Sequence, residues 1–209
     1  MKGILGLLKA KYGKTPEDAP ESAFFTTAFV GQGVDDALLI PWEARATEIG
    51  AKRLPKSRGG KLLEALWSRD KYMSHLDQDA VERMERFFQF ASVPPNRDVI
   101  RQGEYGNFMV VLLNGTIAVD RLQPWGEQLR LAETRPGDIL GEMSLLDSGI
   151  RFSSCTTLTD CELAALNAES MDEMMTKDPQ LAASLVALLA RKLSQRLRVV
   201  SARLSDHQN

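Results

Sequence analysis

A succession of short strand-like segments between residues 97 and 166 most constrains the fold of this chain. Apolar residues fill 108–113 and return at 116–119, and the pair Asn114-Gly115 between them readily adopts the positive φ angles of a tight turn. We therefore predict a β-hairpin here. Further strand patterns occur at 128–132, 155–158 and 161–166. Many short strands separated by turns predict a sandwich or a barrel-like roll.

Helical patterns stand on both sides of this predicted roll. Apolar residues at helical spacing fill 61–92, where Asp77 is the predicted N-cap of a second helix that ends before Pro94. After the strands, Asn167 is the predicted N-cap of a short helix, and Pro179 stands at the first position of a longer one. The sequence therefore predicts a mainly β fold with flanking helices.

The chain divides into two regions by composition. Residues 1–60 are interrupted repeatedly by glycine and proline without a long periodic segment, so we interpret them as a partly irregular extension. The predicted domain spans 61–209. Its parts are helices over 61–92, the roll over 97–166 and C-terminal helices over 168–205.

The extension contains apolar and basic segments. Its residues 24–25, 29–30 and 38–42 are too hydrophobic to remain in water, so we expect them to pack on another surface. The basic run 52–61 could hold a phosphate backbone, but its proline and glycines favour a solvated linker. The formal net charge of -2 lacks the basic excess of nucleic-acid-binding domains, so we do not expect a nucleic acid as partner.

Composition also argues against metal and catalytic chemistry. The 2 histidines and 2 cysteines are His75, His207, Cys155 and Cys161, and their spacing suits neither a zinc site nor a Ser-His-Asp or Cys-His triad. We therefore predict a protein that is not an enzyme, with no catalytic residue and no metal ligand. Free buried thiols, without a secretory signal or a membrane-spanning stretch, indicate a cytoplasmic protein.

Residues 137–151 carry the most specific chemistry. Gly141 opens a short apolar turn whose free backbone N–H groups would accept an anion. Glu142 follows at once, and an ionised carboxylate accepts hydrogen bonds from sugar hydroxyls. Arg151 comes after a glycine-containing bend and can close on the same anion with bidentate donors. Together these groups suit a nucleotide monophosphate.

This stretch resembles the phosphate-binding cassette of cyclic nucleotide-binding domains, the family found in catabolite activator proteins, protein kinase A regulatory subunits and cyclic nucleotide-gated channels. Arg151 stands ten positions after Gly141, a spacing similar to the kinase subunits. The family pattern also includes 100–104, 108–111, 114–115 and 136–138, in that order. The resemblance covers about residues 70–205 and implies a jelly-roll-like double-stranded β-helix with a long C-terminal helix.

The resemblance implies roles for individual residues. Glu142 would hold the ribose 2′-hydroxyl and Arg151 would neutralise the cyclic phosphate, so the implied ligand is cAMP or another cyclic nucleotide, without a cofactor. Arg196 and Ser201 match the segment of catabolite activators that contacts adenine, whereas Val200 stands where those proteins carry threonine. The implied ligand-binding residues are Gly141, Glu142, Met143, Ser144, Arg151, Phe152, Ser153, Arg196 and Ser201.

Two residues of this stretch depart from the family pattern. Ile150 replaces the proline that commonly precedes the arginine, and Phe152 follows the arginine where the family usually has Ala, Ser or Thr. Phe152 could stack on the base, turn into the roll so that Ser153 approaches the phosphate, or block the pocket. We favour binding, because Glu142 and Arg151 would otherwise have no purpose at a pocket mouth. The alternative is that these two side chains pair with each other.

The final helix carries a narrow apolar stripe. Its members step by three or four residues and are Leu185, Leu189, Leu193, Leu197, Val200 and Leu204. Such a stripe suits a seam against a second copy of the chain, so we predict a homodimer through this helix. The alternative is that the stripe packs on the roll of its own chain.

These observations favour a cytoplasmic cAMP sensor or adaptor that signals through helix rearrangement to a separate, unidentified protein. The chain ends at Asn209, whereas catabolite activators continue from the long helix into a helix-turn-helix domain. We keep two alternatives. One is a catabolite-activator-like transcription regulator without its helix-turn-helix. The other is a degenerate roll that binds no nucleotide and acts as a protein-interaction module, with Phe152 filling the site.

Overall fold

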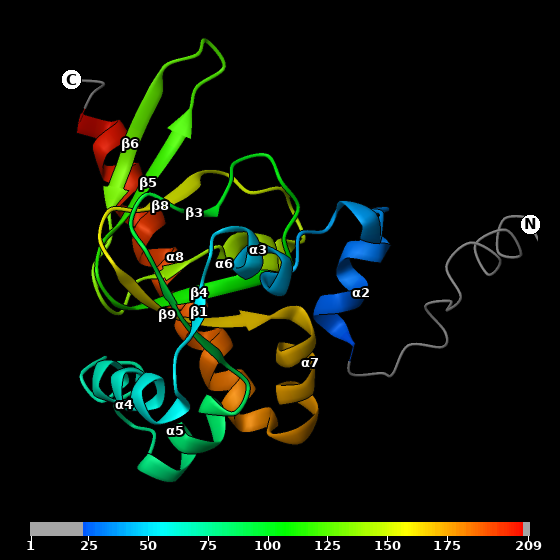
Figure 1. Ribbon diagram of the computed structural model, residues 1–209, viewed down its shortest axis with the longest axis vertical. Helices are drawn as coiled ribbons and strands as arrows, with labels where there is room; N and C mark the ends of the chain where they lie inside the picture. Colours follow the sequence, from blue (N-terminus) through cyan, green and yellow to red (C-terminus); the bar gives the residue numbers. More distant parts are fainter. Residues whose placement is uncertain (1–22, 207–209) are drawn as a thin grey trace, which may run out of the picture.

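Two antiparallel β-sheets lie at the centre of the computed structural model, which describes residues 23–206 (Figure 1). The five-stranded sheet has the order β1-β2-β9-β4-β7, from Lys52–Arg53, Gln89–Val93, Cys161–Asn167, Phe108–Asn114 and Ile139–Leu140. The four-stranded sheet has the order β3-β8-β5-β6, from Asp98–Ile100, Ser154–Thr157, Ile117–Leu122 and Gln128–Glu133. Residues 1–22 and 207–209, with His207 among them, lie outside the described residues.

Helices cover one face of the five-stranded sheet, and the four-stranded sheet covers the other (Figure 1). The covering helices are α4 (Lys56–Trp67), α5 (Gln78–Glu85), α7 (Ala168–Lys177) and the first half of the long α8 (Pro179–Asp206). This arrangement confirms the predicted fold class, a β-roll with flanking helices and a long C-terminal helix.

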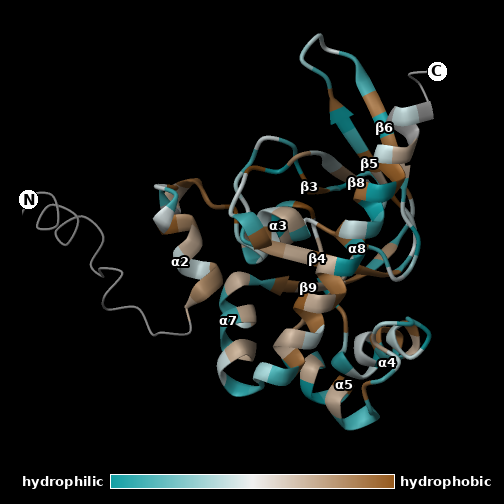
Figure 2. Cartoon of the chain, turned by 180° about the vertical axis from the view of Figure 1, so that it is seen from behind, coloured by the Kyte–Doolittle hydropathy of each residue, from teal (hydrophilic) through white to brown (hydrophobic). Residues whose placement is uncertain are grey.

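Strand β4 separates the two hydrophobic cores. Its residues Met109 and Val111 face the helices, whereas Phe108 and Val110 face the four-stranded sheet, because successive side chains of a strand point to opposite faces. Figure 2 shows hydrophobic residues along β9, the neighbour of β4 in the sheet. The central strands therefore hold both layers of the molecule together.

The predicted hairpin at Asn114-Gly115 was wrong. β4 pairs with β9 and β7, whereas β5 pairs with β6 and β8, so this turn is a corner between the two sheets. Gly115 does have a positive φ of 96°, and a Cβ there would lie 2.5 Å from the carbonyl oxygen of Asp160. The pairing differs because β4 is buried on both faces and so belongs in the interior of a sheet, not at the edge of a hairpin.

The helical prediction over 61–92 was wrong at both ends. α4 begins inside the basic run that we interpreted as a linker, and α5 ends at Glu85. Residues 89–93 form strand β2, which pairs with β9 over its whole length. Gly59 lies within α4, and a Cβ there would lie 2.8 Å from the Cβ of Phe90. A glycine at this position therefore allows the helix to approach β2 closely.

The predicted starts of three helices were confirmed. At the start of α5, Asp77 Oδ1 accepts a hydrogen bond from Ala80 N at 2.7 Å. At the start of α7, Asn167 Oδ1 accepts one from Ser170 N at 2.9 Å. α8 begins at Pro179. Capping depends on a few adjacent residues, so local sequence is sufficient to predict it.

The apolar stripe of α8 divides into two halves. Leu185 and Leu189 are buried in the core of the chain itself, as the packing alternative expected. Leu197 and Val200 are 67% and 52% exposed. The second half of the stripe therefore offers an apolar surface that the described residues do not cover.

The described part of the extension packs on the domain through some of the apolar residues expected to do so, whereas Phe24, Val30 and Leu38 are exposed. It forms α2 (Phe24–Gly31), the 3-10 helix η2 (Asp36–Leu38) and α3 (Trp42–Glu48). Phe25, Phe29 and Trp42 are buried.

A single carboxylate fixes the start of α2 on α7. Asp172, which is buried on α7, accepts hydrogen bonds from Phe25 N at 2.8 Å and from Thr26 N at 2.9 Å. It also accepts one from the hydroxyl of Thr26 at 2.7 Å. The free N–H groups of a helix start favour a negative charge, so this contact ties the extension to the domain.

Replacement of this carboxylate tests its contribution to stability. We expect Asp172→Ala to lower the free energy of unfolding by about 2–4 kcal/mol, because several hydrogen bonds to a charged group are lost and a buried N–H is left without a partner. Urea denaturation measures the change, with Glu173→Ala on the exposed side of the same helix as the control. Equal stabilities of the two variants would contradict this role of Asp172.

Candidate functional site

The cassette, residues 141–151, is built around a glycine that no other residue can replace without strain. Gly141 precedes α6 (Glu142–Asp147) and has a left-handed backbone with φ 78°. A Cβ at this position would lie 2.7 Å from Nη1 of Arg151 and 2.8 Å from Cδ1 of Ile100. Glycine is therefore required both by the backbone angle and by the close approach of the arginine.

Arg151, the last residue of the cassette, is buried and does not point into solvent. Its side chain donates from Nη1 to the carbonyl oxygen of Gly141 at 2.8 Å and from Nη2 to that of Phe108 at 2.7 Å. The guanidinium carbon also lies 4.7 Å from the centre of the Phe108 ring. Burial lowers the pKa of Arg151 from its ordinary value to about 10, so the side chain still carries its charge at neutral pH.

The guanidinium keeps donors available for an anion. A guanidinium has five N–H donors, and within residues 23–206 the two hydrogen bonds of Arg151 use two of them. Nη1 lies at Gly141, just before the first turn of α6, whose N–H groups have no acceptor within the helix. Gly106 also leaves room for this side chain, since a Cβ there would lie 2.6 Å from Nη2 of Arg151.

Glu142 is paired with the long helix α8. Its carboxylate accepts a hydrogen bond from Nη1 of Arg196, whose Nη2 donates to the carbonyl oxygen of Ile139 at 2.7 Å. The alternative in which Glu142 and Arg151 pair with each other was therefore wrong, because each is already held by a different partner. Glu142 is only 4% exposed, and this burial raises its pKa although Arg196 and Arg151 act in the opposite direction.

Phe152 does not fill the cassette. Its ring is 51% exposed and covers the guanidinium of Arg121 on β5, whose carbon lies 3.7 Å from the ring centre. Nη1 of Arg121 donates to the carbonyl oxygen of Phe152 at 3.1 Å. This placement removes the basis for the reading in which Phe152 blocks the site.

The other predicted site residues lie at different depths around the cassette. Met143 is exposed and Ser144 is buried on α6, and Ser153 is half-buried next to Phe152. Ser201 is exposed on α8, about 7.5 Å further along the helix axis than Arg196. Within this chain, the structure therefore brings Arg196 to the cassette but not Ser201.

Two arginines near the site were not among the predicted site residues. Arg45 of α3 is fully buried and pairs with Glu104 and with Glu48, the latter at 2.8 Å. Arg45 and Glu104 both lie near enough to Arg151 to affect its pKa, which Arg45 lowers and Glu104 raises. Arg121 reaches the cassette only because β5 pairs with β8. No motif marks either arginine, so only the packing of distant elements places them here.

The described residues hold no group of three or more His, Cys, Asp or Glu side chains arranged to bind a metal ion. The predicted free, buried thiols were confirmed for Cys155 and Cys161. Burial raises the pKa of Cys155 to about 12, so this thiol is not reactive at neutral pH. Over 23–206, no helix is both long and apolar enough to cross a membrane.

A family model matches the part of this chain that forms the roll. Residues 90–178 match the model of the cyclic nucleotide-binding domain. The chain contains a domain of this family. The match includes most of β2, the cassette and α7, so Gly141, Glu142 and Arg151 lie within the matched segment, whereas Arg196 lies after it.

Known proteins resemble this chain over part of their length. The cyclic AMP receptor protein of Thermus thermophilus is 33% identical over 120 residues, which are 57% of this chain and 56% of that protein. A cyclic nucleotide-binding domain from Methylobacillus flagellatus superimposes with a TM-score of 0.68 at 20% identity, over 73% of this chain and 86% of that chain. The regulatory domain of Toxoplasma gondii PKA superimposes with a TM-score of 0.50 at 21% identity, over 57% and 45%. The chain spans about half the length of the curated relatives it matches.

The buried carboxylate predicts a pH dependence of stability. The pKa of Glu142 is higher in the folded chain than its ordinary value of 4.5, so folding favours the protonated form. Its contribution to stability is complete below pH 4.5 and decreases as the pH rises through the higher folded pKa. We therefore expect the stability of the wild type relative to Glu142→Gln to fall between pH 4.5 and neutral pH.

Urea denaturation at a series of pH values measures this difference. Glu127→Gln, which makes the same change at an exposed position of the β5–β6 hairpin, is the control. A stability difference for Glu142→Gln that stays constant or grows with pH would show that burial does not control this carboxylate.

Proposed function

We propose that this chain is a cyclic nucleotide sensor that binds cAMP at the cassette. The observation that carries the proposal is that a buried carboxylate, Glu142, and a buried guanidinium, Arg151, are both held next to Gly141, where α6 begins. The 33% identical relative named cyclic AMP receptor protein supports cAMP as the ligand.

The cyclic phosphate would bind at the first turn of α6. Backbone N–H groups near Gly141, Met143 and Ser144 would donate to it, together with the unused donors of Arg151. The desolvated surroundings of Arg151 strengthen its attraction for an anion relative to an arginine in water. The exposed ring of Phe152, next to Ser153, offers a face on which a base can stack.

Ligand binding would compete with the contact between the cassette and α8. Because Arg196 holds one oxygen of the buried Glu142 carboxylate, a ribose 2′-hydroxyl would compete with Arg196 for this carboxylate. Arg196 would then release α8, or turn to the base as the resemblance to catabolite activators implies. The ligand would thus favour the arrangement in which Arg196 has left Glu142 over the arrangement in which the two are paired, and this shift would be the signal.

We further propose that the signal passes to a separate protein in the cytoplasm, without catalysis by this chain. The domain at 61–209 would bind the nucleotide, and the extension at 1–60 or α8 would contact the partner. The exposed half of the α8 stripe, at Leu197 and Val200, would form a homodimer, since such a stripe suits pairing with a second copy. Ser201 would then reach the ligand of the partner copy.

Calorimetry tests the proposed ligand. We expect saturable heat with cAMP and none with acyclic 5′-AMP. Arg151→Lys should weaken binding by about tenfold or more, because lysine keeps the charge but loses the planar, multiple donors. The control is Arg191→Lys on the exposed face of α8, which should bind as the wild type does.

Thermal unfolding of each variant shows whether it retains the fold. Absence of heat with wild-type protein, or equal affinity of a folded Arg151→Lys variant and the wild type, would contradict the proposed function.

The competition at Glu142 makes a second prediction. Removal of the competing donor in Arg196→Ala should strengthen cAMP binding by about tenfold, because a charge-assisted hydrogen bond no longer has to be broken. The matched control is Arg198→Ala, which removes an exposed arginine from the same helix. Weaker binding by Arg196→Ala would show instead that Arg196 contacts the ligand directly.

A further inference from the structure

A groove of about 610 Å³ lies away from the cassette, where the extension meets the domain. Its walls come from α3, from β1, from the start of α4 and from the segment that joins α5 to β2. This volume is in the range of pockets that hold small molecules or individual side chains of a ligand. Nothing in the proposed nucleotide site uses it.

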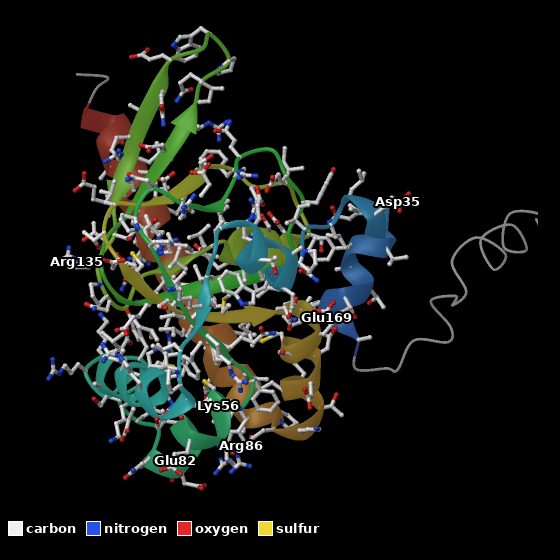
Figure 3. All side chains as sticks on the ribbon, in the orientation of Figure 1. Asp35, Lys56, Glu82, Arg86, Arg135 and Glu169 are labelled. Carbon is white, nitrogen blue, oxygen red and sulfur yellow. The ribbon has the colours of Figure 1, made fainter. Side chains whose placement is uncertain are left out.

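The groove concentrates positive charge in a chain whose net charge is -2. Its lining includes four cations and one carboxylate, an excess of three positive charges, and the members are Lys52, Arg53, Lys56, Arg86 and Glu43. Figure 3 shows Lys56 and Arg86 on the same face of the molecule. All four cations are exposed.

The cations of the groove are not neutralised by the chain itself. Within residues 23–206, no carboxylate forms an ion pair with any of the four. The carboxylate of Glu43 accepts a hydrogen bond from Gln89 at 2.6 Å. Glu85 lies near Lys56 outside the lining, where burial raises its pKa and so disfavours its charge.

The lining between the cations is apolar and held firmly. Trp42 and Phe90 are buried and Phe87 is half-buried in it. The Trp42 ring packs edge-on against Phe108 of β4 at 5.4 Å between centres, and the ring of Phe90 packs on Gly59 of α4. These contacts form the groove before any ligand arrives, which reduces the entropic cost of binding.

We propose that this groove binds an acidic segment of a partner protein that carries an aromatic or aliphatic anchor. The cations come from three separate elements and would contact carboxylates along an extended peptide, whereas the aromatic lining would take the anchor. A phosphate or a nucleic acid backbone would satisfy the cations but supplies no apolar side chain for the lining. The site needs no bound nucleotide, so its test is independent of the proposed function.

The test uses a fluorescein-labelled octapeptide in which Glu alternates with Leu and Phe, titrated with the full chain without cAMP. We expect saturable fluorescence anisotropy that weakens as salt is added, because the contacts are between exposed charges. The double variant Lys56→Glu/Arg86→Glu should weaken binding by about tenfold, since two attractions become repulsions. The control double variant is Lys61→Glu/Arg69→Glu, which makes the same charge change at exposed positions outside the groove.

Three results would overturn the proposal. Equal loss in both double variants would mean general attraction to the protein surface. Equal binding of a peptide with Gln in place of Glu would mean that charge is not recognised. Groove-dependent binding of a duplex oligonucleotide, without binding of the acidic peptide, would make the ligand a nucleic acid. Circular dichroism of each variant confirms that it is folded before the comparison is made.

Discussion

The guanidinium of Arg151 is the interaction on which the arrangement of the site depends. It joins the cassette to β4 through the carbonyl oxygens of Gly141 and Phe108. A buried charge is strongly unfavourable unless hydrogen bonds surround it, so both sides of this contact are constrained. Two glycines, Gly106 and Gly141, provide the space that the side chain fills. The charge that holds the cassette on the sheet is also the one that would attract a phosphate.

A second contact connects the cassette to the rest of the molecule. The pair formed by Glu142 and Arg196 reaches from α6 to the exposed half of α8, a helix of 28 residues. Only the first half of α8 is packed in the core, whereas its second half is largely exposed and reaches the sheet through Arg196, which donates to the carbonyl oxygen of Ile139. β4 also contacts the groove, since Phe108 packs on Trp42. Strand β4 therefore contacts both the cassette, through Arg151, and the groove, through Trp42, and the cassette in turn contacts the long helix.

The outcome of individual predictions separates local from distant causes. The caps at Asp77 and Asn167 were predictable because a cap and its N–H partner are adjacent in sequence. The turn at Asn114-Gly115 had the expected positive φ at its glycine, but its role as a corner depends on which strands β4 pairs with. Gly59 likewise favoured a linker by its local sequence, whereas in the structure it is a helical residue that leaves room for Phe90.

Sequence alone determined the β-roll with its helices, and it placed Gly141, Glu142 and Arg151 in one cassette, because these residues and their spacing fall within a single short segment. Tertiary structure decided their partners. Glu142 is held by a residue 54 positions away, and the ring of Phe152 packs on the guanidinium of Arg121 and does not fill the site. Such contacts arise from the packing of distant elements around a shared core, and no local pattern of residue types specifies them.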